Sequence, residues 1–445
     1  MAAETPGARQ RGARGSPADV IVMSKPRESV LYLVHRVPYP PNRGDRIRSF
    51  HVLEFLASRA EVHLAFLAEE PPSGPTMEVL EGLCRRVAAV PLGRHSRWAH
   101  AAWSLLAGRT ATEGLFSCRD LREIVRRWAQ ETRFDAAFVF CSSMVQYLDA
   151  PGLARVPAIV DLVDVDSQKW LDYAEHSRWL RRSLFRMEGY RLRRLESALP
   201  QRAAAITLVS QCEAEIYRSF CPAECVYAIP NGVDLDYFRP EESAVASRSQ
   251  QCVFVGALDY RANSDGITWF CKNVWPEVRR RRPGAVFRVV GSRPGAAVRR
   301  LARLPGVELV GEVPDVRPYL ADAALVVVPL RVARGIQNKV LEALAMGKAV
   351  VASPQARDGL DVLPGIHLSE ASTPSEWTDA VALLLDNQEL RRRLGLAGRE
   401  LVEASYAWEA RLPAWELPWA RVAASRQRPS ESNPTVDTVS THEPR

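Results

Sequence analysis

The chain has 445 residues, a length that accommodates two α/β domains with extensions. With 47% hydrophobic and 25% charged residues, the composition is that of a folded protein, and a pI near 9.1 with a net charge of +7 favours anionic partners. No stretch approaches the roughly 20 apolar residues of a membrane span, and the eight cysteines form no CxxC pair of a zinc site. We therefore expect a cytoplasmic protein with reduced thiols, and contact with the inner face of the cytoplasmic membrane remains open.

Short apolar runs alternate with helical patterns through the first half of the chain. These runs lack the polar alternation of half-exposed strands, which indicates strands buried on both faces of a parallel sheet. We expect strands at Ser29–His35, Glu61–Phe66, Val87–Pro91, Ala136–Cys141, Ala158–Val163, Ala205–Val209 and Val226–Ile229.

A polar, Ser-rich stretch at 241–251 interrupts this pattern, and we expect a linker there. Two successive βαβ series predict two doubly wound, Rossmann-like domains, at 29–240 and 252–404. Residues 1–28 and 425–445 are expected to be disordered. Ligands bind beyond the carboxyl ends of such strands, so function is expected in the loops that follow them. In the second series we expect strands at Cys252–Ala257, Ala285–Gly291, Val307–Val310, Ala324–Pro329 and Ala349–Ser353.

The loop after the first expected strand contains Gly44, Asp45 and a cluster of arginines, and a helix follows it. Backbone N–H groups at such a helix start can face an anion, and Arg43, Arg46 and Arg48 add positive charge. The loop either closes on a phosphate or a sugar, or is a surface turn with solvated arginines. The residues alone leave both interpretations open.

Two further segments follow expected strands. Residues 229–240 (IPNGVDLDYFRP) contain a Pro-Asn-Gly turn. Residues 330–352 have the pattern of a strand end, a loop at Gly335, a helix, a C-cap at Gly347 and another strand. Lys339 and Glu342 share one face of that helix. Such a glutamate can accept both ribose hydroxyls and the lysine can meet a diphosphate, or the two can form an exposed ion pair.

Three segments in order resemble glycosyltransferase family 4: the Pro38–Arg48 loop, the IPNGVDLDYFRP run and GIQNKVLEALAMGKAVVAS at 335–353. More narrowly, HRVPYPPNRGDRIRSFH and VGALDYRANSDGITWF look like the sugar transferases of bacterial PEP-CTERM/exosortase exopolysaccharide loci. The resemblance spans about 29–424 and implies the GT-B fold, two Rossmann-like domains facing across a cleft. The N-terminal domain would bind the acceptor, the C-terminal domain a nucleotide-sugar donor, and a last helix at 405–424 would cross back to the N-terminal domain. Transfer would retain the anomeric configuration and need no tightly bound metal or other cofactor.

The resemblance also assigns residues by position. Glu342 falls at the second Glu of the family's E-x7-E motif and would hold the ribose, while Gly335 and Ile336 would offer backbone amides to the donor. We expect Asp164, which follows a middle strand, and Asp45 to be catalytic. No metal ligand is expected. The expected donor-binding residues are Gly44, Arg46, Gly256, Arg261, Arg334, Gly335, Ile336, Lys339 and Glu342.

The chain departs from the family pattern at the expected donor site. Arg334 replaces the first Glu of the E-x7-E motif, and the loop at Gly256 lacks the usual Arg and Lys that neutralise the donor diphosphate. Asp164-Val165-Asp166 also matches the DxD metal signature of another transferase fold, but the two-domain architecture favours the metal-independent class. The leaving-group charge still has to be met by a cation, and the candidates are Arg261, Arg331, Arg334 and Lys339.

Residues 178–202 combine many arginines with leucines at helical spacing and with Trp179 and Phe185. Such a helix either lies on an anionic bilayer or packs its leucine face on the sheet, and 95–109 is a second candidate. A polyprenyl-linked or saccharide acceptor suits the first interpretation. Nucleic acid is not an expected partner, because no recognised motif supports it.

The leading hypothesis is therefore a glycosyltransferase of exopolysaccharide biosynthesis. A GT-B-like binding or scaffold protein that has lost catalysis is an alternative, because the first Glu and the basic pair are missing. A sugar-nucleotide epimerase of the same shape is a further alternative, which the IPNGVD segment disfavours.

Overall fold

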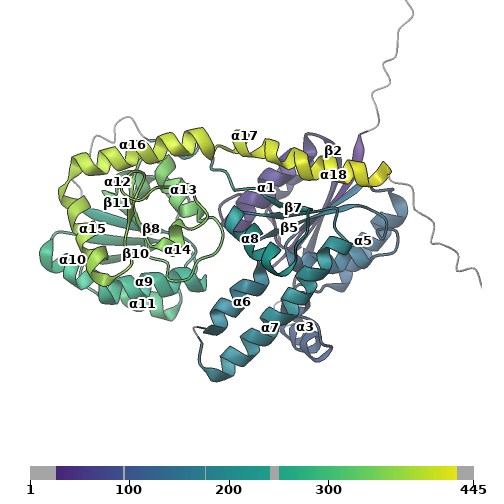
Figure 1. The fold of residues 1–445 in the computed structure, drawn as a ribbon, viewed down its shortest axis with the longest axis horizontal. Coiled ribbons are helices and arrows are strands. Elements are labelled where there is room, and N and C mark those ends of the chain that lie inside the picture. Colours follow the sequence, from purple (N-terminus) through teal and green to yellow (C-terminus); the bar gives the residue numbers. More distant parts are fainter. Residues whose placement is uncertain (1–26, 94–95, 176, 241–249, 428–445) are drawn as a thin grey trace, which may run out of the picture.

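The computed structural model describes residues 27–93, 96–175, 177–240 and 250–427, which form two parallel sheets flanked by helices (Figure 1). Most of the expected extension at 1–28 and of the linker at 241–251 lies outside the described residues. So do position 95, where the second basic segment begins, and the tail beyond residue 427. Three residues of the expected disordered tail, 425–427, belong instead to the last helix.

The first sheet has seven strands in the order β3-β2-β1-β4-β5-β6-β7, and every neighbouring pair is parallel. Each strand lies within two residues of the position predicted from the apolar runs. The strands are β1 (Glu28–Val34), β2 (Ala60–Ala68), β3 (Arg86–Pro91), β4 (Ala136–Phe140), β5 (Ala158–Val163), β6 (Ala205–Leu208) and β7 (Val226–Ala228).

Both faces of this sheet are buried, as the apolar runs predicted. In β1, Val30 and Tyr32 belong to one hydrophobic cluster, whereas Leu31 and Leu33 belong to the cluster on the other face. Helices supply the cover on each side. They are α1 (Gly44–Ala57), α2 (Gly74–Leu83), α3 (Ser96–Leu106), α4 (Ala111–Leu115), α5 (Arg119–Glu131), η1 (Ser142–Asp149), α6 (Asp166–Glu175), α7 (Trp179–Ala198), η2 (Leu199–Gln201) and α8 (Gln211–Phe220).

The second sheet has six parallel strands in the order β10-β9-β8-β11-β12-β13. Five strands agree with the prediction, and β13 was not predicted because it has only two residues. The strands are β8 (Gln251–Val255), β9 (Val286–Val290), β10 (Val307–Gly311), β11 (Leu325–Val328), β12 (Ala349–Ala352) and β13 (Ser369–Glu370). The helices are α9 (Arg261–Asn273), α10 (Trp275–Arg281), α11 (Ala296–Leu301), α12 (Arg317–Asp322), α13 (Asn338–Ala345), α14 (Pro354–Arg357), α15 (Pro374–Asp386) and α16 (Gln388–Ser405).

In each sheet the strand order reverses beside the first strand, between β1 and β4 and between β8 and β11. Loops leave the sheet in opposite directions at such a point, so ligands bind there in doubly wound domains. The expected site residues follow these strands or their neighbours.

The chain returns to the N-terminal domain after α16, through α17 (Trp408–Arg411), η3 (Leu412–Trp415) and α18 (Glu416–Gln427), along the top of Figure 1. Trp415 and Val422 are buried in the core of that domain. Trp408 packs on Gly232, where a Cβ atom would lie 2.7 Å from the indole ring. Two segments connect the domains: residues after β7 lead out of the N-terminal domain (the first interdomain crossing), and residues after α16 lead back to it (the second). Gly232 of the IPNGVD run therefore lets these two segments touch.

Candidate active site

The loops at the carboxyl ends of the two sheets meet one another. A Cβ atom at Gly44, the first residue of α1, would lie 3.6 Å from Asn338 Nδ2 at the start of α13. Asn231 Nδ2, on the first interdomain crossing, donates to Asn338 Oδ1 at 3.0 Å. We call the region formed by these loops the interdomain face.

Arg48 does not add positive charge to the first loop, contrary to the prediction. Its guanidinium and the Asp161 carboxylate are fully buried and form a bidentate pair, with Nε–Oδ2 at 2.7 Å and Nη2–Oδ1 at 3.0 Å. Nη1 also donates to the Ile229 carbonyl and to Asn231 Oδ1. Because helical geometry turns Arg48 toward the sheet, its charge connects β5 with the interdomain crossing instead of facing a ligand.

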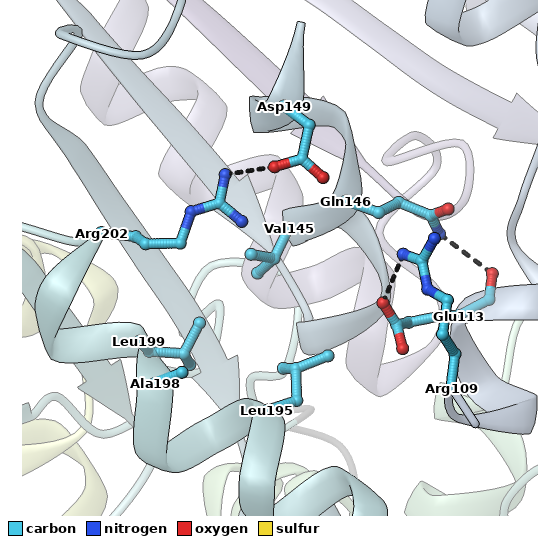
Figure 2. Close-up of a pocket in the computed structure, with 9 residues that line it drawn as sticks. All are labelled: Arg109, Glu113, Val145, Gln146, Asp149, Leu195, Ala198, Leu199 and Arg202. Atoms are coloured by element: carbon cyan, nitrogen blue, oxygen red, sulfur yellow. Dashed lines mark hydrogen bonds and ion pairs between the residues drawn. The ribbon is translucent and has the colours of Figure 1, made fainter. Parts of the chain in front are cut away.

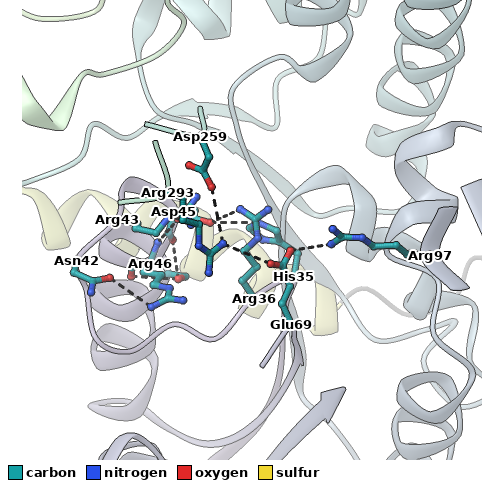
Figure 3. A network of polar contacts seen from close by, with 11 residues as sticks. His35, Arg36, Asn42, Arg43, Asp45, Arg46, Glu69, Arg97, Asp259 and Arg293 are labelled. Atoms are coloured by element: carbon teal, nitrogen blue, oxygen red, sulfur yellow. Dashed lines mark hydrogen bonds and ion pairs between the residues drawn. The ribbon is translucent and has the colours of Figure 1, made fainter. Parts of the chain in front are cut away.

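Asp45 lies in the first turn of α1 at the centre of a polar network (Figure 3). Arg36 Nη1 donates to its Oδ2 at 2.9 Å, and His35 Nε2 and Arg43 Nε lie within 3.9 Å of the carboxylate. Burial opposes its ionisation, but the neighbouring His35, Arg36 and Arg43 lower the pKa of Asp45 to about 2. Burial also lowers the pKa of His35 to about 4, so at neutral pH the arginines provide the positive charge. Asp45 is thus an ionised acceptor that cannot supply a proton at neutral pH.

Asp164 follows β5 through a strained turn. Val163 has φ +68° and the Asp164 N–H donates to the Leu162 carbonyl at 2.9 Å, which is a γ-turn that β-branched residues rarely adopt. Burial raises the pKa of Asp164, with Asp166 adding to the effect. Such strain is concentrated at functional sites in proteins, and the catalytic role of Asp164 stays a prediction.

The Gly335 loop of the C-terminal domain rests directly on Asp164. Gly335 has φ +62°, and a Cβ atom there would lie 2.1 Å from Asp164 Oδ1, so both conformation and space require glycine. The buried carboxylate of Glu213, on α8, accepts a hydrogen bond from the Val165 N–H at 2.7 Å, and the nearby Gly335 backbone favours its ionised form. Burial and the nearby Asp164 raise the pKa of Glu213 to about 7.

Sequence reasoning did not identify Glu213. The Ser210-x-x-Glu213 spacing signals a helix start, and the Ser210 hydroxyl does cap α8 by accepting from the Glu213 N–H. The Glu213 side chain, however, reaches Val165 and Gly335 instead of the helix start. Only the tertiary fold brings these residues together.

Lys339 and Glu342 lie half-buried on α13 beside Gly256, where a Cβ atom would be 3.2 Å from Lys339 Cε. They do not form the exposed ion pair that the sequence left open, since among the described residues Lys339 has no carboxylate within 4.0 Å. Lys339 Nζ donates to Gln337 Oε1 at 3.1 Å. Burial lowers the pKa of Lys339 to about 8 and raises that of Glu342 to about 7. Both groups are therefore desolvated and available to a ligand, as in many binding sites.

The other candidate cations have protein partners. Arg261 lies over the ring of Tyr173 at 5.1 Å, and Arg331 is 3.6 Å from Asp265. Arg334 pairs with Asp172 at 2.6 Å. Arg46 Nη1 is 3.4 Å from Asn42 Oδ1.

Arg293 is a cation of the interdomain face that the sequence did not indicate. It follows β9 with φ +54°, and its Nη1 lies 3.9 Å from both Glu69 and Asp259, which belong to different domains (Figure 3). Its signal in the sequence is only a Gly-Ser-Arg loop after an apolar run.

Within the described part of the chain, no group of three or more His, Cys, Asp or Glu side chains is placed to hold a metal ion. Asp166, the second aspartate of the DxD match, accepts a hydrogen bond from the Ser142 hydroxyl at 2.7 Å. A pocket of about 170 Å³ lies away from the interdomain face, between α7 and η1 (Figure 2). Its charged groups pair with one another, Arg109 with Glu113 and Arg202 with Asp149.

Comparison with known proteins agrees with this architecture. Residues 249–387 match the model of a family described as glycosyl transferases group 1. Lipopolysaccharide 1,2-N-acetylglucosaminetransferase of Salmonella typhimurium is 26% identical over 238 residues, 48% of this chain and 61% of that protein. A GDP-mannose-dependent alpha-(1-6)-phosphatidylinositol monomannoside mannosyltransferase of Mycobacterium tuberculosis is 29% identical over 228 residues, 46% of this chain and 58% of that protein. The chain thus spans about three fifths of the length of these relatives.

Solved structures match over most of the chain. Sucrose-phosphate synthase from Thermosynechococcus elongatus has a TM-score of 0.64 at 18% identity, covering 90% of this chain and 100% of that one. Anabaena HepE in complex with UDP-glucose has 0.62 at 14% identity, covering 89% and 99%. WaaG, a glycosyltransferase involved in lipopolysaccharide biosynthesis, has 0.62 at 13% identity, covering 90% and 100%. The predicted fold class is confirmed: the chain has the GT-B fold, and its second half contains a glycosyl transferases group 1 domain.

Proposed function

We propose that the protein is a retaining, metal-independent glycosyltransferase that moves a sugar from a nucleotide-sugar to a saccharide or lipid-linked acceptor in exopolysaccharide biosynthesis. The observation that carries the proposal is the Lys339–Glu342 pair beside Gly256. Among the described residues no carboxylate lies within ion-pair distance of the half-buried Lys339 ammonium, although the charge of Glu342 favours its protonated form. Such an ammonium suits the donor diphosphate, and the half-buried Glu342 carboxylate one turn away suits the ribose hydroxyls. Both residues lie within the segment that matches the glycosyl transferases group 1 family.

Lys339 is the candidate cation that best suits the leaving group. Arg261, Arg331 and Arg334 already lie against protein partners. With a pKa of about 8, Lys339 is near its titration point in the free protein, and an incoming diphosphate would favour its charged form. A cation that is already desolvated stabilises the leaving diphosphate more than a solvated one.

The first test is thermal stabilisation of the full chain by UDP-, GDP-, ADP- and CDP-sugars, with and without EDTA. A ligand at 100 times its Kd adds about 2.7 kcal/mol, which corresponds to about 5–10 °C for a domain of this size. We expect a shift with one nucleotide class, unchanged by EDTA and lost in Lys339→Met and Glu342→Ala, but kept in the distant control Cys221→Ser. No shift with any donor would instead favour a scaffold protein without catalysis.

The basic segment at 178–202 has an exposed beginning, which is compatible with membrane contact, and a later part whose leucines pack on the protein. Trp179 and Leu180, at the start of α7, are 75% and 66% exposed, whereas Leu192 and Leu199 are buried. α3 exposes Trp98 and Trp103, and it lies against α7, where Arg191 donates to the Leu105 carbonyl at the end of α3. Figure 1 displays α3, α6 and α7 projecting together from the N-terminal domain.

This projecting surface supports peripheral contact with an anionic bilayer, because exposed tryptophans lie among arginines of α7. Among the described residues, no helix combines the length and apolar character needed to cross a membrane. We expect the protein to sediment with phosphatidylglycerol-containing vesicles more than with phosphatidylcholine vesicles. Trp98→Ser/Trp179→Ser should reduce this binding, whereas Leu417→Ser, at an equally exposed position on α18, should not. Equal binding of both variants would contradict the assignment.

A further inference from the structure

Arg334 joins the two domains by an ion pair. It lies in the loop between β11 and α13, and its Nε and Nη2 atoms lie 2.7 and 2.6 Å from Asp172 Oδ2 on α6. The two side chains are only 20% and 17% exposed, so this pair is largely shielded from solvent. Arg334 Nη1 also lies 3.8 Å from the buried carboxylate of Glu213.

The same loop is held at its next residue. The Gly335 backbone lies near the Glu213 carboxylate, and a Cβ atom at Gly335 would lie 2.1 Å from Asp164 Oδ1. Arg334 therefore anchors the loop at Asp172 while Gly335 contacts the two neighbouring acids. The positive charge of Arg334 also opposes the burial that raises the pKa values of both Asp164 and Glu213.

Neighbouring contacts bring the same two parts of the molecule together. Lys169 Nζ, on α6, lies 5.9 Å from the ring centre of Tyr260, which precedes α9. Arg261, the first residue of α9, lies over the ring of Tyr173 on α6. One face of α6 thus contacts two loops of the C-terminal domain.

We propose that Arg334 is a positioning residue: its ion pair with Asp172 sets the arrangement of the two domains and holds the Gly335 loop on Asp164. In this role Arg334 is not a ligand of the donor diphosphate. The inference goes beyond the proposed transfer reaction, because the ion pair exists in the free protein and its effect is measured there.

The test is amide hydrogen exchange of the 332–337 loop in the full, ligand-free chain, combined with the radius of gyration from small-angle X-ray scattering. Arg334→Gln should speed exchange of the loop about tenfold, which corresponds to about 1.4 kcal/mol of lost local stability, and should enlarge the radius of gyration. Asp172→Arg should have the same effect. The swapped pair Arg334→Asp/Asp172→Arg should recover protection, a rescue that damage to the fold would not produce.

Arg357→Gln is the control, since Arg357 pairs with Glu370 at 2.5 Å entirely within the C-terminal domain, with side chains that are 34% and 27% exposed. It should leave exchange of the 332–337 loop unchanged. Unchanged exchange in Arg334→Gln, or no recovery in the swapped pair, would overturn the inference. If Arg334→Gln instead weakens only the thermal shift caused by UDP, Arg334 is a donor ligand. Because the exchange measurement needs no donor, it remains decisive even if no nucleotide-sugar binds.

Discussion

Replacing Arg48 with Met removes the centre of a buried hydrogen-bond network, whose members Arg48 and Asn231 are 183 residues apart in the sequence. Arg48 makes two hydrogen bonds to Asp161, one to the Ile229 carbonyl and one to Asn231, and its guanidinium lies 5.0 Å from the ring centre of Trp415. In Arg48→Met the Asp161 carboxylate stays fully buried, with the hydrogen bond from Thr207 Oγ1 as its remaining contact among those described.

Removing one partner of a buried ion pair costs about 3–5 kcal/mol, because the other charge stays unpaired. For a domain of this size, each kcal/mol lowers the melting temperature by about 2–4 °C. We therefore expect Arg48→Met to lower the midpoint by about 6–20 °C. The double variant Arg48→Met/Asp161→Leu should be more stable than Arg48→Met, since no unpaired carboxylate remains.

Scanning calorimetry of the wild type, the two variants and Arg86→Met measures these differences. Arg86 pairs with Glu131 at the surface, where both side chains are at least 40% exposed, so its loss should have no measurable effect. A midpoint of Arg48→Met within about 2 °C of wild type would refute the calculation. A double variant less stable than Arg48→Met would refute the explanation by an unpaired charge.

Four further predictions concern the α13 pair and two glycines. Burial raises the pKa of Glu342 from 4.5 to about 7, so the folded chain holds this proton more tightly and stability falls as pH rises between these values. Glu213 contributes a fall over the same interval, so Glu342→Gln should make the fall in melting temperature smaller without removing it. Burial lowers the pKa of Lys339 from 10.5 to about 8, so this group by itself makes stability rise over this interval. The melting temperature of Lys339→Met should therefore lack this contribution when it is plotted against pH beside the wild type. A curve of unchanged shape in either variant would contradict the burial. Gly335→Ala places a Cβ atom 2.1 Å from Asp164 Oδ1 at a residue with φ +62°. It should reduce the rate of sugar transfer at least tenfold, or about 1.4 kcal/mol, in line with the roughly 1–2 kcal/mol cost of that backbone conformation. A turnover equal to that of the wild type would disprove the contact. Gly232→Ala, against Trp408, should cost about 1–3 kcal/mol in urea unfolding, while Gly295→Ala, with no atom within 4 Å of its Cβ position, should cost less.

Local sequence was sufficient for the sheets and for the general location of the candidate site. Runs such as Ala136–Phe140 are apolar along their whole length, and this pattern by itself indicates burial on both faces. The positions of Gly335 in a loop and of the Lys339–Glu342 pair on the helix after it follow from the same reasoning, because function in parallel sheets lies beyond the strand ends. The two-residue strand β13 is too short to produce a pattern.

The partners of the charged residues were not predictable in the same way. The sequence placed Arg48 in a basic loop and Arg334 at the donor site, and it did not indicate their carboxylate partners, which lie 113 and 162 residues away. Glu213 carried only the signal of a helix start. A pair of charges interacts through space, and the distance between them depends on the path of the whole chain, including the return of Trp408 and Trp415 to the first domain. The sequence by itself determined which segments are strands and where loops with chemical groups emerge. The tertiary structure decided which of those groups are neutralised by the protein and which are left for a ligand.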